Sequence, residues 1–415
     1  MKLFAFILVS VLCTMPLQAA VYRSANLGWE AGKDVTEAFG NLIADGKLKA
    51  GDKLVLDAIY EISGELELPS DFTLSAVKGG GFNVTHAASD KNTRFLVLGD
   101  KTVLRNLTIT YVGTPDPGPG GGTNPTRGKH FYPMVGIEAS DKSDIRIEQC
   151  RLIGSIAHHV RLNSCARPKI IGCHIVGGFW TINLRGNTTE FEMRNTLIEL
   201  CQGDGIKTSR IAGKGIKNAM VDNCVFQDCA RDGIDTTGGW KDSVVRNTIF
   251  RRAFGGLDLK GIYENPSDLS PDIRNSGIII ENCRFVDIPN AIVLTTLDRG
   301  LKHDGQHFLD PDNVEEHAPH DIRIDNCVFG QTGKPGFAVK HPTEVNQSMR
   351  MLFVKGGHSV SYREVRFFGE NIQVVGYSNG FEQWGPRVLS KEAAEALNDN
   401  VTGTVAGTAE MPEPG

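Results

Sequence analysis

Between residues 100 and 370, apolar and polar positions alternate in short runs that repeat one phrase. Each copy has an alternating run, then Asn or a similar residue, then Cys or Thr, then further apolar positions; the copies lie at Asn106, Gln149, Gly172, Asn195, Asn223, Asn247, Asn282 and Asn326. From Gln149 to Asn247 the steps are 23, 23, 28 and 24 residues. A period of roughly 20 to 50 residues is typical of a solenoid, whose repeats pack only on their neighbours.

Each repeat contains short strands of period two, separated by Gly, Asn and Asp turn residues, and no helix-length amphipathic run intervenes. We therefore predict an all-β fold, a right-handed parallel β-helix with three short strands per coil, over residues 51–385. Coils stacked about 4.8 Å apart align equivalent residues in columns. The Asn residues should form an amide ladder at a bend. An inward column of buried free thiols is expected for Cys150, Cys173, Cys224, Cys283 and Cys327, alongside Thr196 and Thr248.

The two ends of the chain differ from the repeats. Residues 1–20 have the features of a secretory signal peptide: Lys2, an apolar run from residue 3 to 15, and small residues at 19 and 20. Residues 21–50 should cap the solenoid with a short helix from Asp34 to Asp45, with Asp34 as N-cap. In residues 386–415 we expect a helix over 390–397 and a disordered tail from residue 402.

Composition narrows the class of protein. With 40% hydrophobic and 22% charged residues the chain is neither disordered nor a polytopic membrane protein, and no membrane span is expected. The 44 Lys and Arg against 49 Asp and Glu give a net charge of −5, which argues against a nucleic-acid partner. We expect a monomer located in the periplasm or outside the cell.

One strand of each coil carries a column of polar residues that should face outward. The column runs through Glu138, Arg161, Asn183, Lys207, Asp235 and Asp258, and the neighbouring column through Asn163, Arg185, Ser209, Thr237 and Lys260. Further polar or aromatic residues at the edges of the same face are His158, His159, Trp180, Asp204, Arg231 and Asp232. A patch of both charge signs across several coils, with a Trp that a sugar ring could cover, predicts a binding groove.

The leader, the cap helix, the Asn-Cys coils and the face from Lys207 to Lys260 together resemble the secreted polysaccharide lyases of the chondroitinase B and alginate lyase kind. The resemblance lies in fold and site placement and covers most of the chain after residue 20. It implies cleavage of an acidic, uronate-containing polysaccharide by β-elimination.

Such an elimination needs a group that neutralises the C6 carboxylate, a base that removes the C5 proton and an acid that protonates the leaving O4. Lys207 is the expected base, because like-charge repulsion from Arg185 and Arg161 would lower its pKa while Asp235 would oppose this. The carboxylate would be held by Arg185 or Arg161 with Asn183. The acid would be His158, His159 or Tyr132.

The remaining residues of this face are expected to contact the polymer, namely Trp180, Arg231 and Lys260. Calcium is the one cofactor that the residues could hold, because calcium-dependent members of the resembling group use acidic and amide ligands. Glu138, Asn183, Asp235 and Asp258 offer such oxygens, and repulsion by Lys207 would place the ion toward Asp235 and Asp258.

Two alternatives remain open. Asp204, Asp232, Asp235 and Asp258 resemble the clustered acids of polygalacturonase-like hydrolases, and residues 231–235 resemble their Asn-Thr-Asp-Gly-Ile-Asp signature. Hydrolysis needs two carboxylates about 5 to 9.5 Å apart, which Asp235 and Asp258 on adjacent coils could meet. A solenoid that binds carbohydrate without cleaving it is the other alternative.

Overall fold

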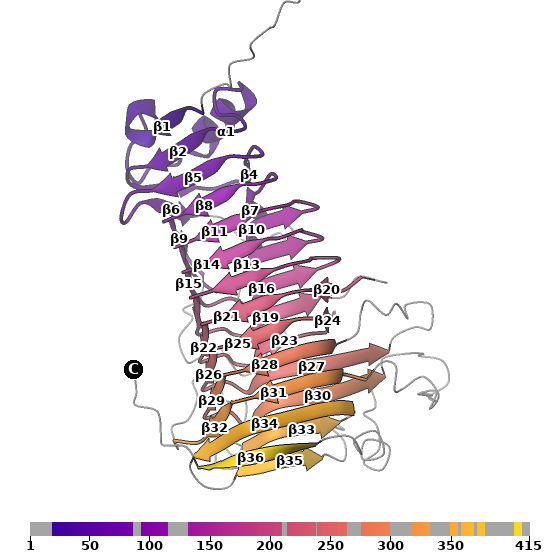
Figure 1. Ribbon diagram of the computed structural model, residues 1–415. Helices are drawn as coiled ribbons and strands as arrows, with labels where there is room; N and C mark the ends of the chain where they lie inside the picture. The colour runs from indigo at the N-terminus through magenta and orange to yellow at the C-terminus, as the bar shows by residue number, and fades with distance from the viewer. Residues whose placement is uncertain are drawn as a thin grey trace, which may run out of the picture.

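The chain forms a stack of coils along one axis, from the N-terminal end at the top of Figure 1 to the C-terminal strands at its bottom. The computed structural model describes residues 19–85, 93–114, 132–209, 214–237, 239–263, 275–298, 318–332, 349–355, 358–368, 372–377 and 402–408. Its strands pair in parallel, and a typical coil contributes three of them. The predicted parallel β-helix is therefore confirmed.

One sheet has a single strand from each coil. Its order along the stack is β4 (Leu66–Glu67), β7 (Arg94–Val97), β10 (Tyr132–Ser140), β13 (Ile156–Asn163), β16 (Trp180–Arg185), β19 (Asp204–Ser209), β23 (Asp232–Asp235), β27 (Gly255–Tyr263), β30 (Asn290–Asp298), β33 (Met349–Lys355) and β35 (Ile372–Tyr377). We call it the face sheet, because it carries the predicted polar columns.

The second sheet bends around the rest of each coil. Before the bend lie β2 (Lys53–Leu56), β5 (Thr73–Ala76), β8 (Val103–Arg105), β11 (Arg146–Glu148), β14 (Lys169–Ile171), β17 (Glu192–Arg194), β21 (Met220–Asp222), β25 (Val244–Arg246), β28 (Ser276–Glu281) and β31 (His320–Asp325). After it lie β3 (Ile59–Ile62), β6 (Gly81–Val84), β9 (Thr108–Tyr111), β12 (Arg151–Ile153), β15 (His174–Val176), β18 (Leu197–Glu199), β22 (Val225–Gln227), β26 (Ile249–Arg251), β29 (Arg284–Val286) and β32 (Val328–Gly330). The sheet also includes β1 (Val21–Arg23), β20 (Ile216–Lys217), β24 (Trp240–Lys241), β34 (His358–Phe368) and β36 (Thr402–Thr408).

The bend of this sheet explains the recurring Asn. Residues Asn106, Asn195, Asn223, Asn247, Asn282 and Asn326 have φ between 47° and 59°, the left-handed region that Asn tolerates better than most residues. Their side chains form only part of the predicted ladder. Asn223 Nδ2 donates to Asn195 Oδ1 at 2.7 Å and Asn326 Nδ2 to Asn282 Oδ1 at 2.8 Å, whereas Asn247 Nδ2 donates to Asp222 Oδ1.

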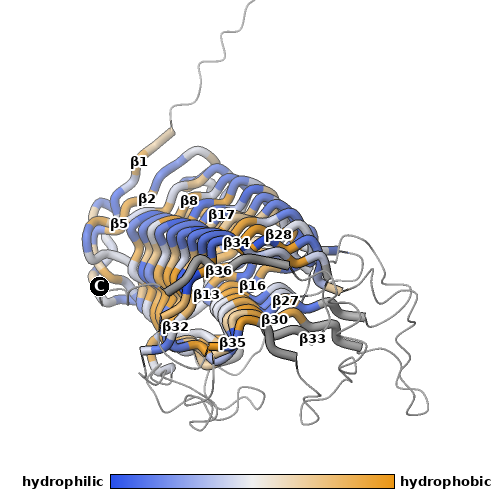
Figure 2. Tube along the Cα trace, turned by 60° about the horizontal axis from the view of Figure 1, so that its bottom comes forward, coloured by the Kyte–Doolittle hydropathy of each residue, from blue (hydrophilic) through white to orange (hydrophobic). Residues whose placement is uncertain are grey.

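The interior repeats from coil to coil, and Figure 2 shows hydrophilic and hydrophobic positions in rows along the stack. Four phenylalanine rings, those of Phe226, Phe250, Phe285 and Phe329, stack at centroid spacings of 5.0, 5.1 and 4.9 Å, close to the separation of adjacent parallel strands. The eight cysteines of the described residues are buried free thiols. The backbone N–H of Cys173 donates to Thr196 Oγ1, and that of Cys224 donates to Thr248 Oγ1, so the predicted column of thiols and Thr substitutes is confirmed.

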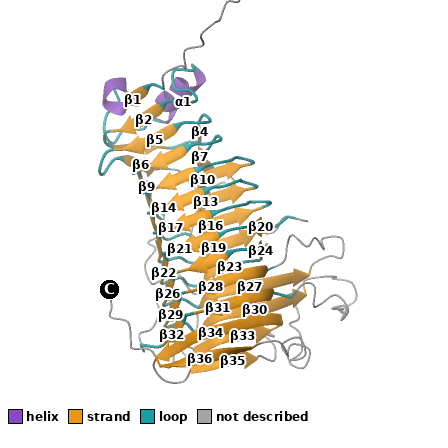
Figure 3. Cartoon of the chain, in the orientation of Figure 1, coloured by secondary structure: helices purple, strands orange, loops and turns teal. Residues whose placement is uncertain are grey.

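Both described helices lie at the N-terminal end, η1 (Ser24–Leu27) and α1 (Thr36–Ala44) (Figure 3). The predicted cap helix is therefore present, and its own Phe39 is fully buried. Its N-cap is Val35 and not Asp34, although Asp34 Oδ1 accepts the Thr36 N–H at 2.9 Å.

At the C-terminal end the prediction of a disordered tail is wrong for residues 402–408, and residues 409–415 lie outside the described ranges. Strand β36 pairs with β34, because an exposed parallel edge offers its N–H and C=O groups to a further strand. The predicted signal peptide up to residue 18 and the helix over 390–397 lie outside the described residues. No helix in the described ranges is both long and apolar enough to cross a membrane.

Candidate functional site

The strand register confirms that the predicted residues form one column of the face sheet, but Glu138, Asn183, Lys207 and Asp235 are buried and not exposed. Glu138 pairs with Arg161, Arg161 with Asn183, Asn183 with Lys207, Lys207 with Asp235 and Asp235 with Asp258. The next partner is Val293, so the charged part of the column ends at β27. Of the neighbouring column, Asn163, Arg185 and Ser209 are in register.

Asp235 lies at the centre of the charged residues and is completely buried. Its Oδ2 atom contacts the ammonium of Lys207 and lies 2.7 Å from Nζ of Lys260, while Oδ1 accepts the Thr237 hydroxyl at 2.8 Å. Burial alone would raise the pKa of Asp235, but Lys207, Lys260 and Arg231 hold it well below its ordinary value. Asp235 is therefore an ionised counter-ion of these cations at neutral pH.

The two lysines that contact Asp235 have pKa values shifted in opposite directions. Burial lowers the pKa of Lys207, and repulsion from Lys260 and Arg231 adds to this against the attraction of Asp235 and Asp204. Burial also disfavours the charged form of Lys260, but Asp235 and Asp258 outweigh it and raise its pKa. The lowered pKa of Lys207 agrees with the sequence-based prediction, but its cause is burial and Lys260, not Arg185 and Arg161.

A second set of acids lies beside this centre. Carboxylate oxygens of Asp204, Asp232 and Asp235 all lie within 4.8 Å of one another. Burial, then repulsion from Asp258 and Asp204, raises the pKa of Asp232 well above its ordinary value. A Cβ at Gly255 would lie 2.1 Å from Asp232 Oδ1, so only glycine leaves room for this carboxyl group.

Asp258 is the acid nearest to solvent, with 14% of its side chain exposed. Its Oδ2 lies 2.8 Å from Lys260 Nζ, and its Oδ1 has no hydrogen-bond partner among the described residues. Burial and then Asp235 raise the pKa of Asp258 in spite of Lys260. It is therefore a carboxyl group that holds its proton more tightly than an ordinary Asp.

These residues do not fit the calcium ion that the sequence suggested. The oxygens of Asp235 are taken by two ammonium groups and a hydroxyl, and Glu138 receives both Nε and Nη2 of Arg161, at 3.1 and 2.7 Å. The acid trio also has cationic neighbours. Lys207 Nζ lies 3.9 Å and Arg231 Nε 3.7 Å from the carboxylate of Asp204. Cationic side chains already supply the positive charge that a metal would bring.

The aromatic part of the face consists of Trp180 and His158. Their rings stack at 5.7 Å with an interplanar angle of 21°, and Lys207 Nζ lies 5.8 Å from the centroid of the Trp180 ring. Burial lowers the pKa of His158 to about 4, so its ring is neutral at neutral pH. The Trp180 side chain is half-buried and borders the charged centre.

Of the predicted site residues, His159 does not lie on this surface. His159 is fully buried and its ring packs against Tyr111 at 5.3 Å, with Nε2 2.9 Å from the Gly154 carbonyl oxygen. Placing it on the outer face was wrong: strict alternation would put His159 on the same side as Arg161, but the alternation is broken at His159 and Val160, which are both buried, and the His159 ring enters the core beside Tyr111. Tyr132 begins β10, and its side chain lies outside the described part of the structure.

Arg161 and Arg185 differ in a way that the sequence does not reveal. Arg161 is bound to Glu138 by two hydrogen bonds, whereas Arg185 makes no ion pair with the described residues and its buried Nε lacks a partner. Asn183 beside it is 1% exposed and donates Nδ2 to Ser209 Oγ at 2.9 Å, which leaves its Oδ1 unpartnered. The sequence analysis did not predict that Lys207 Nζ donates to Thr237 Oγ1 at 2.5 Å. It also did not predict that Gly255 leaves room for the Asp232 side chain, although the Gly-Gly pair at 255–256 could have indicated this.

The comparisons with known proteins agree on the fold. The family described as "Right handed beta helix region" matches residues 127–258 and 181–303. No curated protein matches the sequence. The architecture is thus a right-handed parallel β-helix.

Three solved structures of this architecture are similar to the chain. The surface protein and adhesin PfbA of Streptococcus pneumoniae has a TM-score of 0.57 at 11% identity, over 94% of this chain and 99% of that one. The polygalacturonase of Erwinia carotovora ssp. carotovora has 0.54 at 13%, over 86% and 96%. The catalytic unit of the α-1,3-glucanase from Streptomyces thermodiastaticus has 0.52 at 12%, over 95% and 69%. At such identities the likeness concerns the fold alone.

Proposed function

We propose that the protein cleaves an acidic, uronate-containing polysaccharide by β-elimination on the face sheet, outside the cytoplasm and as a monomer. The observation that carries the proposal is Lys207: its amine is nearly buried, has a lowered pKa and borders the Trp180 ring. An amine with a lowered pKa loses its proton more readily and can then accept the C5 proton of a uronate.

The uronate carboxylate needs a cationic partner that no other residue already neutralises. Arg185 fits this role better than Arg161, because Glu138 occupies Arg161. Asn183, which is 1% exposed and held by Ser209 Oγ, supports this part of the face beside Lys207. Arg231, whose side chain is 30% exposed, is available to the next sugar along the face.

The leaving O4 needs a proton donor. His158 is neutral because of its low pKa, and His159 is buried away from the face, so neither is a strong acid there. Asp258 has a raised pKa and a side chain that is 14% exposed, and it lies two strands from Lys207 in the same column. We therefore assign the acid to Asp258, with Lys260 linking it to Asp235.

The test is a panel of alginate, pectate, glycosaminoglycans and ulvan, followed by the ultraviolet absorbance of the unsaturated uronate product. Lys207→Ala should abolish turnover, and the matched control Lys169→Ala, which removes a lysine paired with Glu192 on the other sheet, should retain it. A near-normal rate for Lys207→Ala would return Lys207 to the role of a counter-ion to Asp235.

Hydrolysis is the second candidate, favoured by one observation: neighbouring Asp232 and Asp235 have pKa values displaced in opposite directions. Such a pair matches the acid and the ionised carboxylate of glycoside hydrolysis. The similar structures include a polygalacturonase and a glucanase. New reducing ends without the ultraviolet product would decide for hydrolysis. Neither signal on any polymer would favour a binding solenoid, as the similarity to an adhesin allows.

A further inference from the structure

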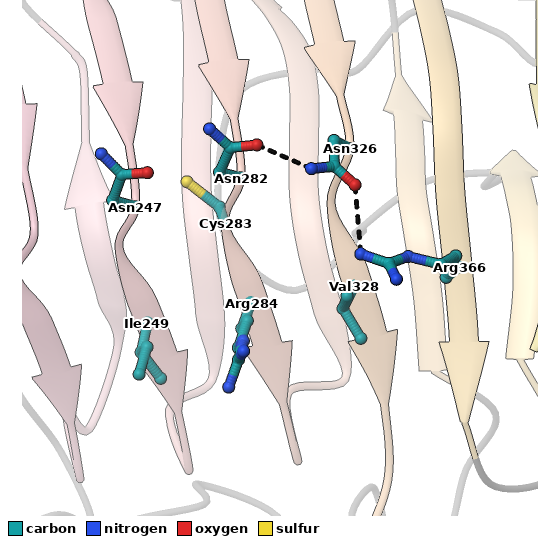
Figure 4. Close-up of a pocket in the computed structure, with 8 residues that line it drawn as sticks. All are labelled: Asn247, Ile249, Asn282, Cys283, Arg284, Asn326, Val328 and Arg366. Carbon is teal, nitrogen blue, oxygen red and sulfur yellow. Dashed lines mark hydrogen bonds between the residues drawn. The ribbon is translucent and has the colours of Figure 1, made fainter. Parts of the chain in front are cut away.

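A hollow of about 410 Å³ lies on the second sheet, at the bend beside β26, β29 and β32 (Figure 4). Its upper row consists of the ladder amides Asn247, Asn282 and Asn326, and its lower row consists of Ile249, Arg284 and Val328. The volume falls in the range of small-molecule sites, roughly 300 to 1,000 Å³. None of the residues of the polar columns lines this hollow.

The charge of the hollow is not balanced locally. Elsewhere on this sheet arginines pair with acids, as Arg246 does with Asp222 at 3.0 Å and Arg252 with Asp228 at 2.6 Å. In contrast, Arg284 and Arg366 form no ion pair with any described residue, and no acid is among the described residues that line the hollow. In a protein of net charge −5, this is a local positive surface.

The amide ladder is interrupted at the same place. Asn326 Nδ2 donates to Asn282 Oδ1 and Arg366 Nη2 donates to Asn326 Oδ1, at 2.8 and 3.1 Å. Asn247 instead turns its Nδ2 to Asp222. No hydrogen bond joins Asn247 Oδ1 to Asn282 Nδ2 in the described structure, so one acceptor and one donor remain available at the hollow.

The spacing of the two guanidinium-bearing positions points to a chain ligand. Arg284 pairs with Val328, and Val328 pairs with Arg366, so the two arginines are two strands or about 10 Å apart. Val328 gives apolar surface between the two arginines, and Ile249 extends it on the other side of Arg284. An extended sugar chain offers acid groups at about this spacing when every second residue turns its acid to the same side.

We propose that this hollow is a second binding site for the acidic polysaccharide, remote from the face sheet. Arg284 and Arg366 bind two acid groups, the free amide atoms of Asn247 and Asn282 bind hydroxyl groups, and Ile249 and Val328 contact the sugar rings. The site rests on the proposed function only for the identity of the polymer. It holds the enzyme on its substrate without taking part in the bond cleavage.

The test is affinity electrophoresis of the full chain in gels that contain pectate, alginate or chondroitin sulfate. All proteins carry Lys207→Ala, so that the polymer is not cut during the run. The double variant R284Q/R366Q should bind roughly tenfold more weakly, as expected for the loss of two charge-assisted contacts. The matched control is Arg151→Gln, an exposed arginine of β12 several coils away, which should leave the affinity unchanged.

The outcomes separate this site from the proposed reaction. Equal retardation of the double variant and the Arg151 control would overturn the second site, whether or not the wild-type protein cleaves the polymer. Equal losses in gels containing inorganic polyphosphate would also overturn it, because they would show attraction by charge alone. A loss confined to the acidic polysaccharides supports the site even if no cleavage is found.

Discussion

Replacing Asp235 by Asn tests whether the charged centre lies in a low-dielectric environment. The substitution keeps the shape and the hydrogen bond from Thr237 but removes the counter-ion of Lys207 and Lys260. At 2.7 Å and an effective dielectric constant of about 20, the pair with Lys260 attracts by about 6 kcal/mol before desolvation is counted. Loss of one partner from such a buried pair costs about 3–5 kcal/mol, because Lys207 then keeps Asp204, at 3.9 Å, as its nearest described counter-ion. We expect the free energy of unfolding to fall by that amount.

The assay is denaturant unfolding at neutral pH, with Glu65→Gln as the matched control. Glu65 also accepts two hydrogen bonds, from Nε and Nη2 of Arg94 at 2.8 and 2.7 Å, but both side chains are about one third exposed. Its loss should cost no more than about 1 kcal/mol. Equal losses for the two variants would refute the reasoning, because burial would then add nothing to the pair at Asp235.

Three further outcomes are expected. Lys260→Met should raise the pKa of Lys207, because it removes a repelling charge, and should slow carbamylation of Lys207 by cyanate near neutral pH; an unchanged rate would contradict this. The wild-type protein should lose stability as pH rises from about 4 through the raised pKa of Asp232, because the folded state keeps that proton longer. Asp232→Asn should lack this slope in unfolding experiments across pH, and identical slopes would count against a protonated Asp232. Gly233→Ala should cost about 1–3 kcal/mol, since its Cβ would lie 2.5 Å from the Phe250 ring; a loss below 0.5 kcal/mol, read from the unfolding midpoint, would argue against this contact.

The periodic part of the fold could be predicted because each coil repeats the same local requirements. The bend of each coil requires a left-handed φ, which Asn tolerates. The inward position after it requires a small residue, which Cys or Thr supplies. Both residue types therefore recur at a regular spacing. The outward column from Glu138 to Asp258 followed from the same period. Strand β36 could not be predicted, because it joins the sheet without a copy of the repeated phrase.

The roles within the column were less accessible, because they depend on which charges meet and how deeply they lie. Arg161 and Arg185 lie on successive coils and look equivalent in the sequence pattern. Among the described residues, however, only Arg161 has a carboxylate partner. His158 and His159 are adjacent, yet one stacks on Trp180 and the other lies in the core. The pKa of Lys207 depends on Lys260, which is distant in sequence and meets it only through the shared oxygen of Asp235.

The stacked register sets the distances at which groups of this face can act together. Lys207, Asp235 and Asp258 come from three successive coils, so their backbones are separated by whole steps of about 4.8 Å. Gain or loss of a complete coil would therefore exchange one neighbour for another without disturbing the path of the chain. A single-residue insertion inside β23 would instead turn Asp235 toward the core and an apolar residue toward solvent. Such a protein can diversify by duplication of entire coils and by changes in its loops, while the spacing between neighbouring residues of the column stays constant.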